Sequence, residues 1–153
     1  MFSLLAAALA ATPAEEPSPW VEQSFVIVAS EKTFDAALAK AGQISVKSGI
    51  AFNMRNTLFD PSQRSSNGGL THSKEDCETV GGYPCYIPRG RWDSGAYLSI
   101  EYSSAIESFT PDLYVVIAAS GSPEEVKPSL QRIKKAVPDA YIKSASVYMG
   151  CLH

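Results

Sequence analysis

Two stretches of the chain repeat one pattern, in which an apolar run is followed by a segment of helical periodicity. The apolar runs cover residues 25–30 and 114–120, are rich in β-branched residues, and end in small turn-forming residues. Such short apolar runs bounded by turn signals are typical of buried strands. We therefore expect one strand in each.

The helical segments begin directly after these runs. Apolar residues recur every three or four positions between residues 34 and 44, with Thr33 placed to cap the helix and Gly49 to end it. After the second run, residues 122–125 have the form of a capping box with proline at the first helical position, and the apolar spacing continues to Val137. The pattern predicts two helices, each with one apolar stripe.

Partial alternation of apolar and polar residues predicts three further strands, over residues 50–59, 96–102 and 139–149. The chain then divides into two βαβ halves with the strand 96–102 between them. Helices of this kind bury their stripes by lying on the sheet, and two of them on one face leave the other face open. The expected fold class is α+β: a two-layer sandwich with a mainly antiparallel sheet of about five strands, two helices on one face, and a pseudo-repeat of two βαβ halves.

The segment 60–95 fits neither half, and we expect it to be an inserted functional loop. It is rich in Ser, Gly, Asn and Pro and is far longer than a usual connection. Arginine offers a planar fork to anionic groups and tryptophan a flat apolar face, and both are enriched at binding hot spots. The candidate ligand-binding or partner-binding residues of the loop and the strand after it are Tyr86, Arg89, Arg91, Trp92 and Tyr97.

The same residues have a structural interpretation that the sequence leaves open. Trp92 can hold the loop onto the sheet, and Arg89 and Arg91 can pair with Asp93 or Glu101. Alternating tyrosines are also common in strands.

Length and charge limit the classes of function. The 153 residues form one domain, and the net charge of −3 with a pI near 5.4 provides no basic field for nucleic acid. The apolar run 2–11 is too short to span a bilayer, and we interpret residues 1–14 as a signal peptide cleaved after Ala10 or Ala14. No Lys or Arg precedes the run, so a tail without a targeting role is the alternative. Residues 15–23 then form a flexible segment before a single domain over 24–153, with a periplasmic or secreted location and no membrane span.

Export makes the three cysteines candidates for a disulfide. Cys77 and Cys85 enclose a turn-rich segment, which favours a Cys77–Cys85 bond and leaves Cys151 buried or free for an intermolecular bond. His72 lies near these cysteines, but the spacing lacks the paired ligands of a structural zinc site. The sequence therefore predicts no metal and no cofactor.

The stretch from Leu113 to Lys143 resembles the SPOR domain family. The residues that carry the resemblance are the run 114–118, Ser120-Gly121-Ser122 with Glu124 and Glu125, the helix positions Leu130 and Ile133, and the strand entry 139–142. Family members are small αβ modules of bacterial envelope proteins. The resemblance implies a two-layer fold whose sheet face holds denuded peptidoglycan glycan strands at the septum, and it assigns no individual binding residue here.

Catalytic signatures are few. The sequence has no nucleophile elbow, P-loop, dinucleotide fingerprint or HExxH motif, and its only histidines are His72 in a polar loop and the terminal His153. A pair of acids near the loop could still act as in a glycosidase. The acids considered for such a pair are Glu75, Asp76, Asp93, Glu101 and Glu107.

These observations lead to a hypothesis of binding without chemistry. The chain is expected to be an exported module of the cell envelope, and not an enzyme, that recognises peptidoglycan-like glycan or an envelope protein. One alternative is a periplasmic inhibitor or immunity protein that blocks a toxin or hydrolase through loop 60–95, because pre-ordering a loop lowers the entropy lost on binding. The second alternative is a carboxylate-dependent glycan hydrolase.

Overall fold

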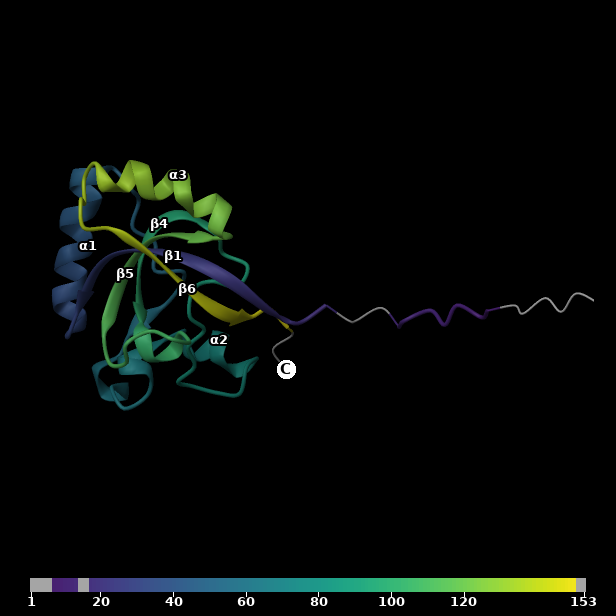
Figure 1. Cartoon of the computed structure of the whole chain (residues 1–153). Helices are drawn as coiled ribbons and strands as arrows, with labels where there is room; N and C mark the ends of the chain where they lie inside the picture. The colour runs from purple at the N-terminus through teal and green to yellow at the C-terminus, as the bar shows by residue number, and fades with distance from the viewer. Residues whose placement is uncertain (1–6, 14–16, 151–153) are drawn as a thin grey trace, which may run out of the picture.

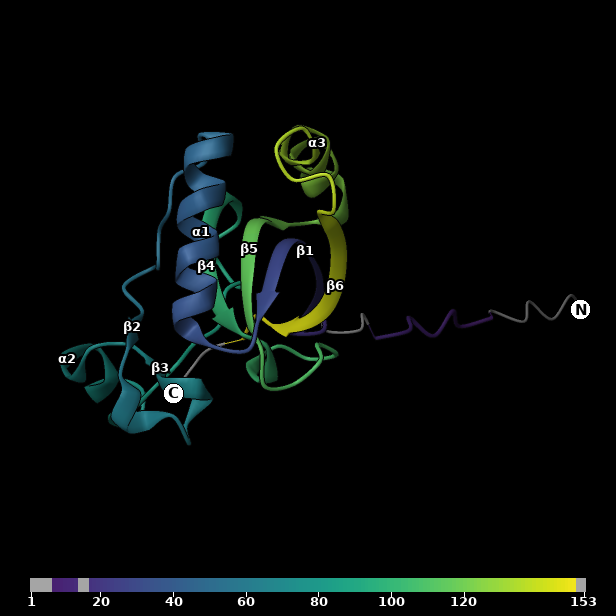
Figure 2. The same cartoon turned by 90° about the vertical axis from the view of Figure 1, so that its left-hand side faces the viewer.

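The computed structural model describes residues 7–13 and 17–150, and its main element is a four-stranded antiparallel sheet of order β4-β5-β1-β6 (Figure 1). The strands are β1 (Trp20–Glu31), β4 (Gly95–Tyr102), β5 (Tyr114–Gly121) and β6 (Tyr141–Tyr148). Figure 2 shows the helices α1 (Phe34–Ser48) and α3 (Pro123–Lys134) on the same side of this sheet. The predicted α+β class is confirmed, with four strands in the sheet instead of five.

The connections form a split βαβ arrangement. Strands β1 and β4 are joined through α1 and lie parallel with β5 between them, and β5 and β6 are joined through α3 with β1 between them. The insertion therefore interrupts the first βαβ unit. The expectation that it separates two complete units is wrong, because β4 closes the first one.

The insertion and the two residues before it contain short elements of their own. They are β2 (Leu58–Phe59), β3 (Leu70–Thr71), α2 (Lys74–Glu78) and the 3₁₀ turns η1 (Pro61–Gln63) and η2 (Asn67–Gly69). Strands β2 and β3 pair antiparallel as a small second sheet. Of the strand expected over 50–59, only its end is formed, as β2: Arg55 and Asn56 have φ of 57° and 60°, a left-handed turn that extended chain does not allow.

The helix ends follow their local sequence signals. The Thr33 hydroxyl accepts a hydrogen bond from the Ala36 N–H, and Gly49 ends α1 in the left-handed conformation. Ser122 and Glu125 form the predicted capping box at the start of α3, with Pro123 as the first helical residue.

Both faces of the sheet are covered. On the helix side, α1 buries the small residues Ala37 and Ala41, while α3 buries Val126 and Ile133. On the other side, the strand residues Phe25, Ile27, Val115 and Ile117 pack against Ile106, Phe109 and Leu113 of the β4–β5 connection, which includes the 3₁₀ turn η3 (Ser103–Ala105). The expectation of an open second face is therefore wrong, since a loop covers it.

Strands β1 and β6 continue past the end of β5 as a two-stranded ribbon. The pairing of β1 with β5 begins only at Ser24, whereas its pairing with β6 already begins at Trp20, opposite Tyr148. Residues 20–23 belong to this ribbon and pair with β6. The prediction of a flexible segment over 15–23 is therefore wrong for these four residues.

Two predictions about the chain ends are not addressed by this fold. Parts of the leader predicted over 1–14 lie outside the described residues, and Cys151 and His153 lie wholly outside them. Among the residues that are described, no helix has the length and apolar character to cross a membrane.

The insertion returns across the second face at Gly90, and this contact can be tested. A Cβ at Gly90 (φ 124°) would come within 2.7 Å of Phe25 Cζ, whereas one at Gly82 (φ 102°) would meet nothing within 4 Å. Gly90→Ala should lower the free energy of unfolding by about 1–3 kcal/mol more than Gly82→Ala. Both substitutions strain the backbone, but only Gly90→Ala also overpacks the core. Urea denaturation of the two variants measures the difference, and equal losses would contradict this packing.

Candidate functional site

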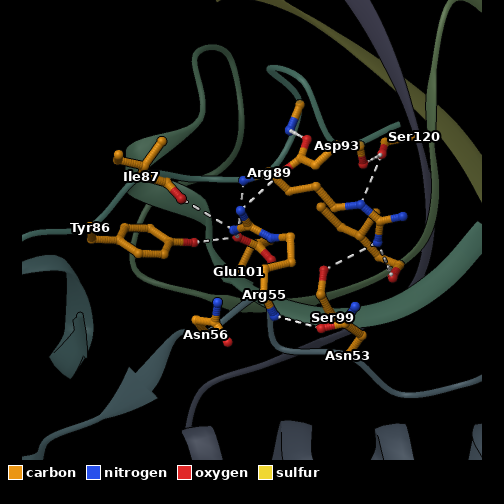
Figure 3. Close-up of polar contacts among 12 residues, drawn as sticks. Asn53, Arg55, Asn56, Tyr86, Ile87, Arg89, Asp93, Ser99, Glu101 and Ser120 are labelled. Carbon is orange, nitrogen blue, oxygen red and sulfur yellow. Dashed lines mark hydrogen bonds and ion pairs between the residues drawn. The ribbon is translucent and has the colours of Figure 1, made fainter. Parts of the chain in front are cut away.

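The distal part of the insertion is tied to the sheet by a buried charged cluster (Figure 3). Its centre is Glu101 on β4, which is 0% exposed. Oxygen Oε1 of Glu101 accepts hydrogen bonds from Arg55 Nη2 at 2.5 Å, the Tyr86 hydroxyl at 2.6 Å and the Arg89 main-chain N–H at 3.1 Å. One carboxylate thus joins the turn after α1, the loop and the strand.

Arg55 connects the cluster to the end of the loop. Its Nη1 donates to Asp93 Oδ2 at 2.9 Å, and its Nη2 also donates to the Ile87 carbonyl at 3.2 Å. Asp93 in turn accepts from the Gly90 N–H at 2.9 Å, which closes the loop on itself. Arg55 and Arg89 match the charges of Glu101 and Asp93, so the cluster is neutral overall.

Burial and charge act together on the pKa values of this cluster. Burial raises the pKa of Tyr86 well above the usual 10.0, and the negative charge of Glu101 adds to the rise. Burial alone would lower the pKa of Arg55, but the attraction of Glu101 outweighs it and the pKa is raised. Burial lowers the pKa of Arg89 to about 10, which still leaves the guanidinium protonated at neutral pH.

Arg89 is an internal brace and not a surface group. It is 1% exposed, and its guanidinium stacks on Tyr97, with the guanidinium carbon 3.5 Å from the ring centroid. Its three nitrogens donate to neutral acceptors 2.8 to 3.1 Å away: the hydroxyls of Ser99 and Ser120 and the carbonyls of Gly95, Tyr97 and Ile117. These acceptors come from β4 and β5, so Arg89 fixes the loop to both strands.

The proximal part of the insertion is braced by covalent and hydrogen bonds. The predicted Cys77–Cys85 disulfide is confirmed, with the two Cα atoms 5.5 Å apart. The Cys85 N–H donates to the Thr71 hydroxyl at 3.1 Å, and the Tyr83 hydroxyl donates to Asp60. The bond therefore holds α2 beside the segment that leads into Tyr86.

A pocket of about 330 Å³ lies where the loop meets the β1–β6 ribbon. Ile87, Pro88, Ile106 and Val147 give it an apolar lining. The polar and aromatic side chains of its wall include Trp20, Arg91, Glu107 and Tyr148. We call this pocket the ribbon groove.

The rim of the ribbon groove carries a connected aromatic and basic set. The rings of Trp20 and Tyr148 meet edge to face with centroids 5.3 Å apart, and Trp20 is 52% exposed. The Arg91 guanidinium carbon lies 5.8 Å from the Tyr148 ring centroid, and the Nη2 group of Arg91 donates a hydrogen bond to the Gly150 carbonyl. Arg91 thus joins the loop to the end of the ribbon.

The five predicted binding residues separate into different places. Tyr86, Arg89 and Arg91 line the ribbon groove, although the polar groups of Tyr86 and Arg89 are engaged internally. Tyr97 lies under Arg89, and its hydroxyl donates a hydrogen bond to the Asp93 carbonyl at 2.9 Å. Trp92 is 78% exposed and is not part of the groove wall. Arg91 and Trp92 remain the candidates for direct ligand contact.

Sequence reasoning missed Arg55, Trp20 and Tyr148. Arg55 fell in an expected strand, and nothing local indicates that it pairs with residues far along the chain. Trp20 fell in the expected flexible segment. Pairing the first strand with the last would have placed Trp20 and Tyr148 together, since they stand at the outer ends of antiparallel neighbours.

Comparisons with known proteins give no further guide to the site: no family model, no curated protein and no solved structure matches the chain. Within the described part of the chain, no three His, Cys, Asp or Glu side chains are grouped so as to hold a metal ion.

The Arg55–Glu101 pair can be tested against a surface pair of the same chain. Arg55→Met should lower the free energy of unfolding by about 3–5 kcal/mol, because it leaves the Glu101 charge buried and unpaired. Lys127→Met removes a pair with Glu124 at 3.9 Å, both side chains mostly exposed, and should change stability by less than about 0.5 kcal/mol.

A double variant separates charge from packing. Arg55→Met with Glu101→Gln should be more stable than Arg55→Met alone, since a neutral amide oxygen still accepts from Tyr86 and Arg89. Chemical denaturation checks all three variants. A double variant that is no better than the single would show that charge burial is not the cause of the loss.

Proposed function

We propose that the chain is an exported, non-catalytic recognition module of the cell envelope, and that its ligand is another envelope protein bound at the ribbon groove. The observation that carries the proposal is the composition of the groove: an apolar lining with Trp20, Tyr148 and Arg91 at the rim. Trp, Tyr and Arg are the residues most enriched at protein-binding hot spots.

The apolar lining favours a protein side chain over a sugar. Ile87, Pro88, Ile106 and Val147 offer no hydrogen bonds from their side chains. Sugar hydroxyls placed against them would lose water without gaining partners, which costs free energy, whereas an apolar side chain gains by the same burial. The glycan binding implied by the SPOR resemblance remains the other ligand class to be tested.

Preorganisation supports a binding role for the wall of the groove. The cluster around Glu101 and the Arg89 brace fix the main chain of residues 86–93 before any ligand arrives. A ligand then loses less entropy than it would on ordering a loose loop. The disulfide and the apolar leader support an oxidising, exported location, periplasmic or secreted.

Trp92 gives specific support to the inhibitor hypothesis. It lies 78% exposed on the braced loop and outside the groove, as a residue that inserts into the active site of a toxin or hydrolase would. The hydrolase hypothesis gains no such support. Of the five acids considered for it, only Glu107 lines the groove, while Glu101 and Asp93 hold Arg55.

Site-specific photo-crosslinking tests the groove directly. Benzoylphenylalanine in place of Tyr148, on the groove rim, should yield a discrete protein adduct in an envelope preparation of the source cells. The same probe in place of Val46, which is 88% exposed on α1, is the control and should yield none. Adducts only from position 46, or equally from both positions, would contradict the groove as the binding site.

Alanine variants then separate the hypotheses. Trp20→Ala or Arg91→Ala should weaken binding of the captured protein by about 2 kcal/mol, roughly 30-fold, if the groove is the site. Trp92→Ala should be the damaging change if the loop acts as an inhibitor. Retention on isolated cell-wall sacculi, lost in Trp20→Ala, would point to glycan instead.

A further inference from the structure

The outer edge of β6 is unprotected, in contrast to the opposite edge of the sheet. The order β4-β5-β1-β6 leaves β4 and β6 at the edges. The edge of β4 is covered by the chain after α1: Leu98 N–H donates to the Ala51 carbonyl and Asn53 N–H to the Leu98 carbonyl, both at 2.8 Å. Among the described residues, Figure 2 shows no such segment along β6.

The pairing of β6 with β1 shows which of its groups face outward. Met149 N–H donates to the Pro19 carbonyl at 2.7 Å, one step beyond the register that pairs Trp20 with Tyr148. Hydrogen-bonded positions alternate in an antiparallel pair, so the odd-numbered residues of β6 bond to β1. The main-chain N–H and C=O groups that point outward belong to Ile142, Ser144, Ser146 and Tyr148. None of these groups has a hydrogen-bond partner within residues 7–13 and 17–150.

Most of the features by which proteins usually guard an edge are missing, and a single lysine is the exception. The β1–β6 register runs without a shift, so no bulge bends the strand, and β6 contains no proline. Its one charged residue, Lys143, directs its ammonium toward the Phe109 ring on the second face, 5.0 Å from the ring centroid. A long, regular and nearly uncharged edge is a template for another strand.

We propose that the strand added to this edge is β6 of a second copy of the chain, paired antiparallel about a two-fold axis at Ala145. This register places Ile142 opposite Tyr148 of the second copy and Ser144 opposite its Ser146, so every outward-facing residue of β6 gains a partner. An axis at Ser144 would instead pair Tyr148 with Ala140, which lies outside the strand. Two-fold pairing of identical patches is the commonest form of soluble oligomer.

The edge is self-complementary in its side chains as well. Lys143 falls opposite Val147 of the second copy and not opposite its own equivalent, so no like charges face each other. Ile142 against Tyr148 is an aromatic and β-branched pair, which is favourable across strands. The second copy's Tyr141, which is half exposed, comes beside Met149, next to the rim of the ribbon groove. Each groove of the dimer would then be flanked by a residue of the other copy.

Sedimentation equilibrium tests the proposal, and it does so whether or not the ribbon groove binds a protein. The full chain, with its disulfide intact and carrying Cys151→Ser to exclude covalent dimers, is examined from about 1 μM to 1 mM, which brackets the affinity of a small interface. The expected result is a reversible rise from the monomer mass to twice that mass. A monomer at all concentrations would overturn the proposal.

Variants assign the dimer to the edge. Ser146→Pro removes an N–H that points away from β1, so it should weaken dimerisation by about tenfold or more while the internal ladder is kept. Ser146→Lys should do the same by adding a charge to the edge, and Ser65→Lys, in the exposed part of the insertion, is its matched control with no effect. If Ser146→Pro lowers the melting temperature, the comparison of Ser146→Lys with Ser65→Lys alone decides whether the dimer forms through this edge. A dimer that both Ser146 variants leave unchanged would overturn the pairing.

Discussion

A carboxylate with no exposure to solvent has to be neutralised where it lies, and the position of Glu101 imposes this requirement on everything around it. Arg55 supplies the charge, while the Tyr86 hydroxyl and the Arg89 N–H supply the remaining donors to Oε1. The three donors come from two segments outside the sheet. The charge on β4 therefore determines where the turn after α1 and the distal loop must lie.

The same requirement explains why the insertion is built into the fold. Arg89 continues the bracing to β5 through neutral acceptors, and Gly90 lets the chain pass against Phe25 on the second face. The disulfide holds the proximal part of the insertion independently of these charges. The wall of the ribbon groove is consequently a fixed surface, and binding to a fixed surface costs less entropy than binding to a loop that must first be ordered.

Local signals were sufficient for the helices but not for the site. Thr33, Gly49 and the capping box at Ser122 act within a few residues, so the sequence predicted both helix starts and the end of α1, whereas α3 ends at Lys134, short of the expected Val137. Arg55 and Glu101 are 46 residues apart and meet only because a left-handed turn replaces the expected strand. Arginine is common at binding hot spots, yet the Arg89 side chain is buried because its hydrogen-bond acceptors lie on β4 and β5. The groove depends on the first and last strands being neighbours, which no local pattern reveals.

Native-state hydrogen exchange at the Arg89 main-chain N–H is the most direct test of the idea that buried charge holds the loop. This N–H donates to Glu101 Oε1, so it should exchange only through global unfolding, as slowly as the amides of the central strands β1 and β5. In the Arg55→Met variant it should exchange by local opening, well ahead of those amides. Fast exchange of the Arg89 amide in the unaltered protein, at the rate of an exposed loop, would contradict the account.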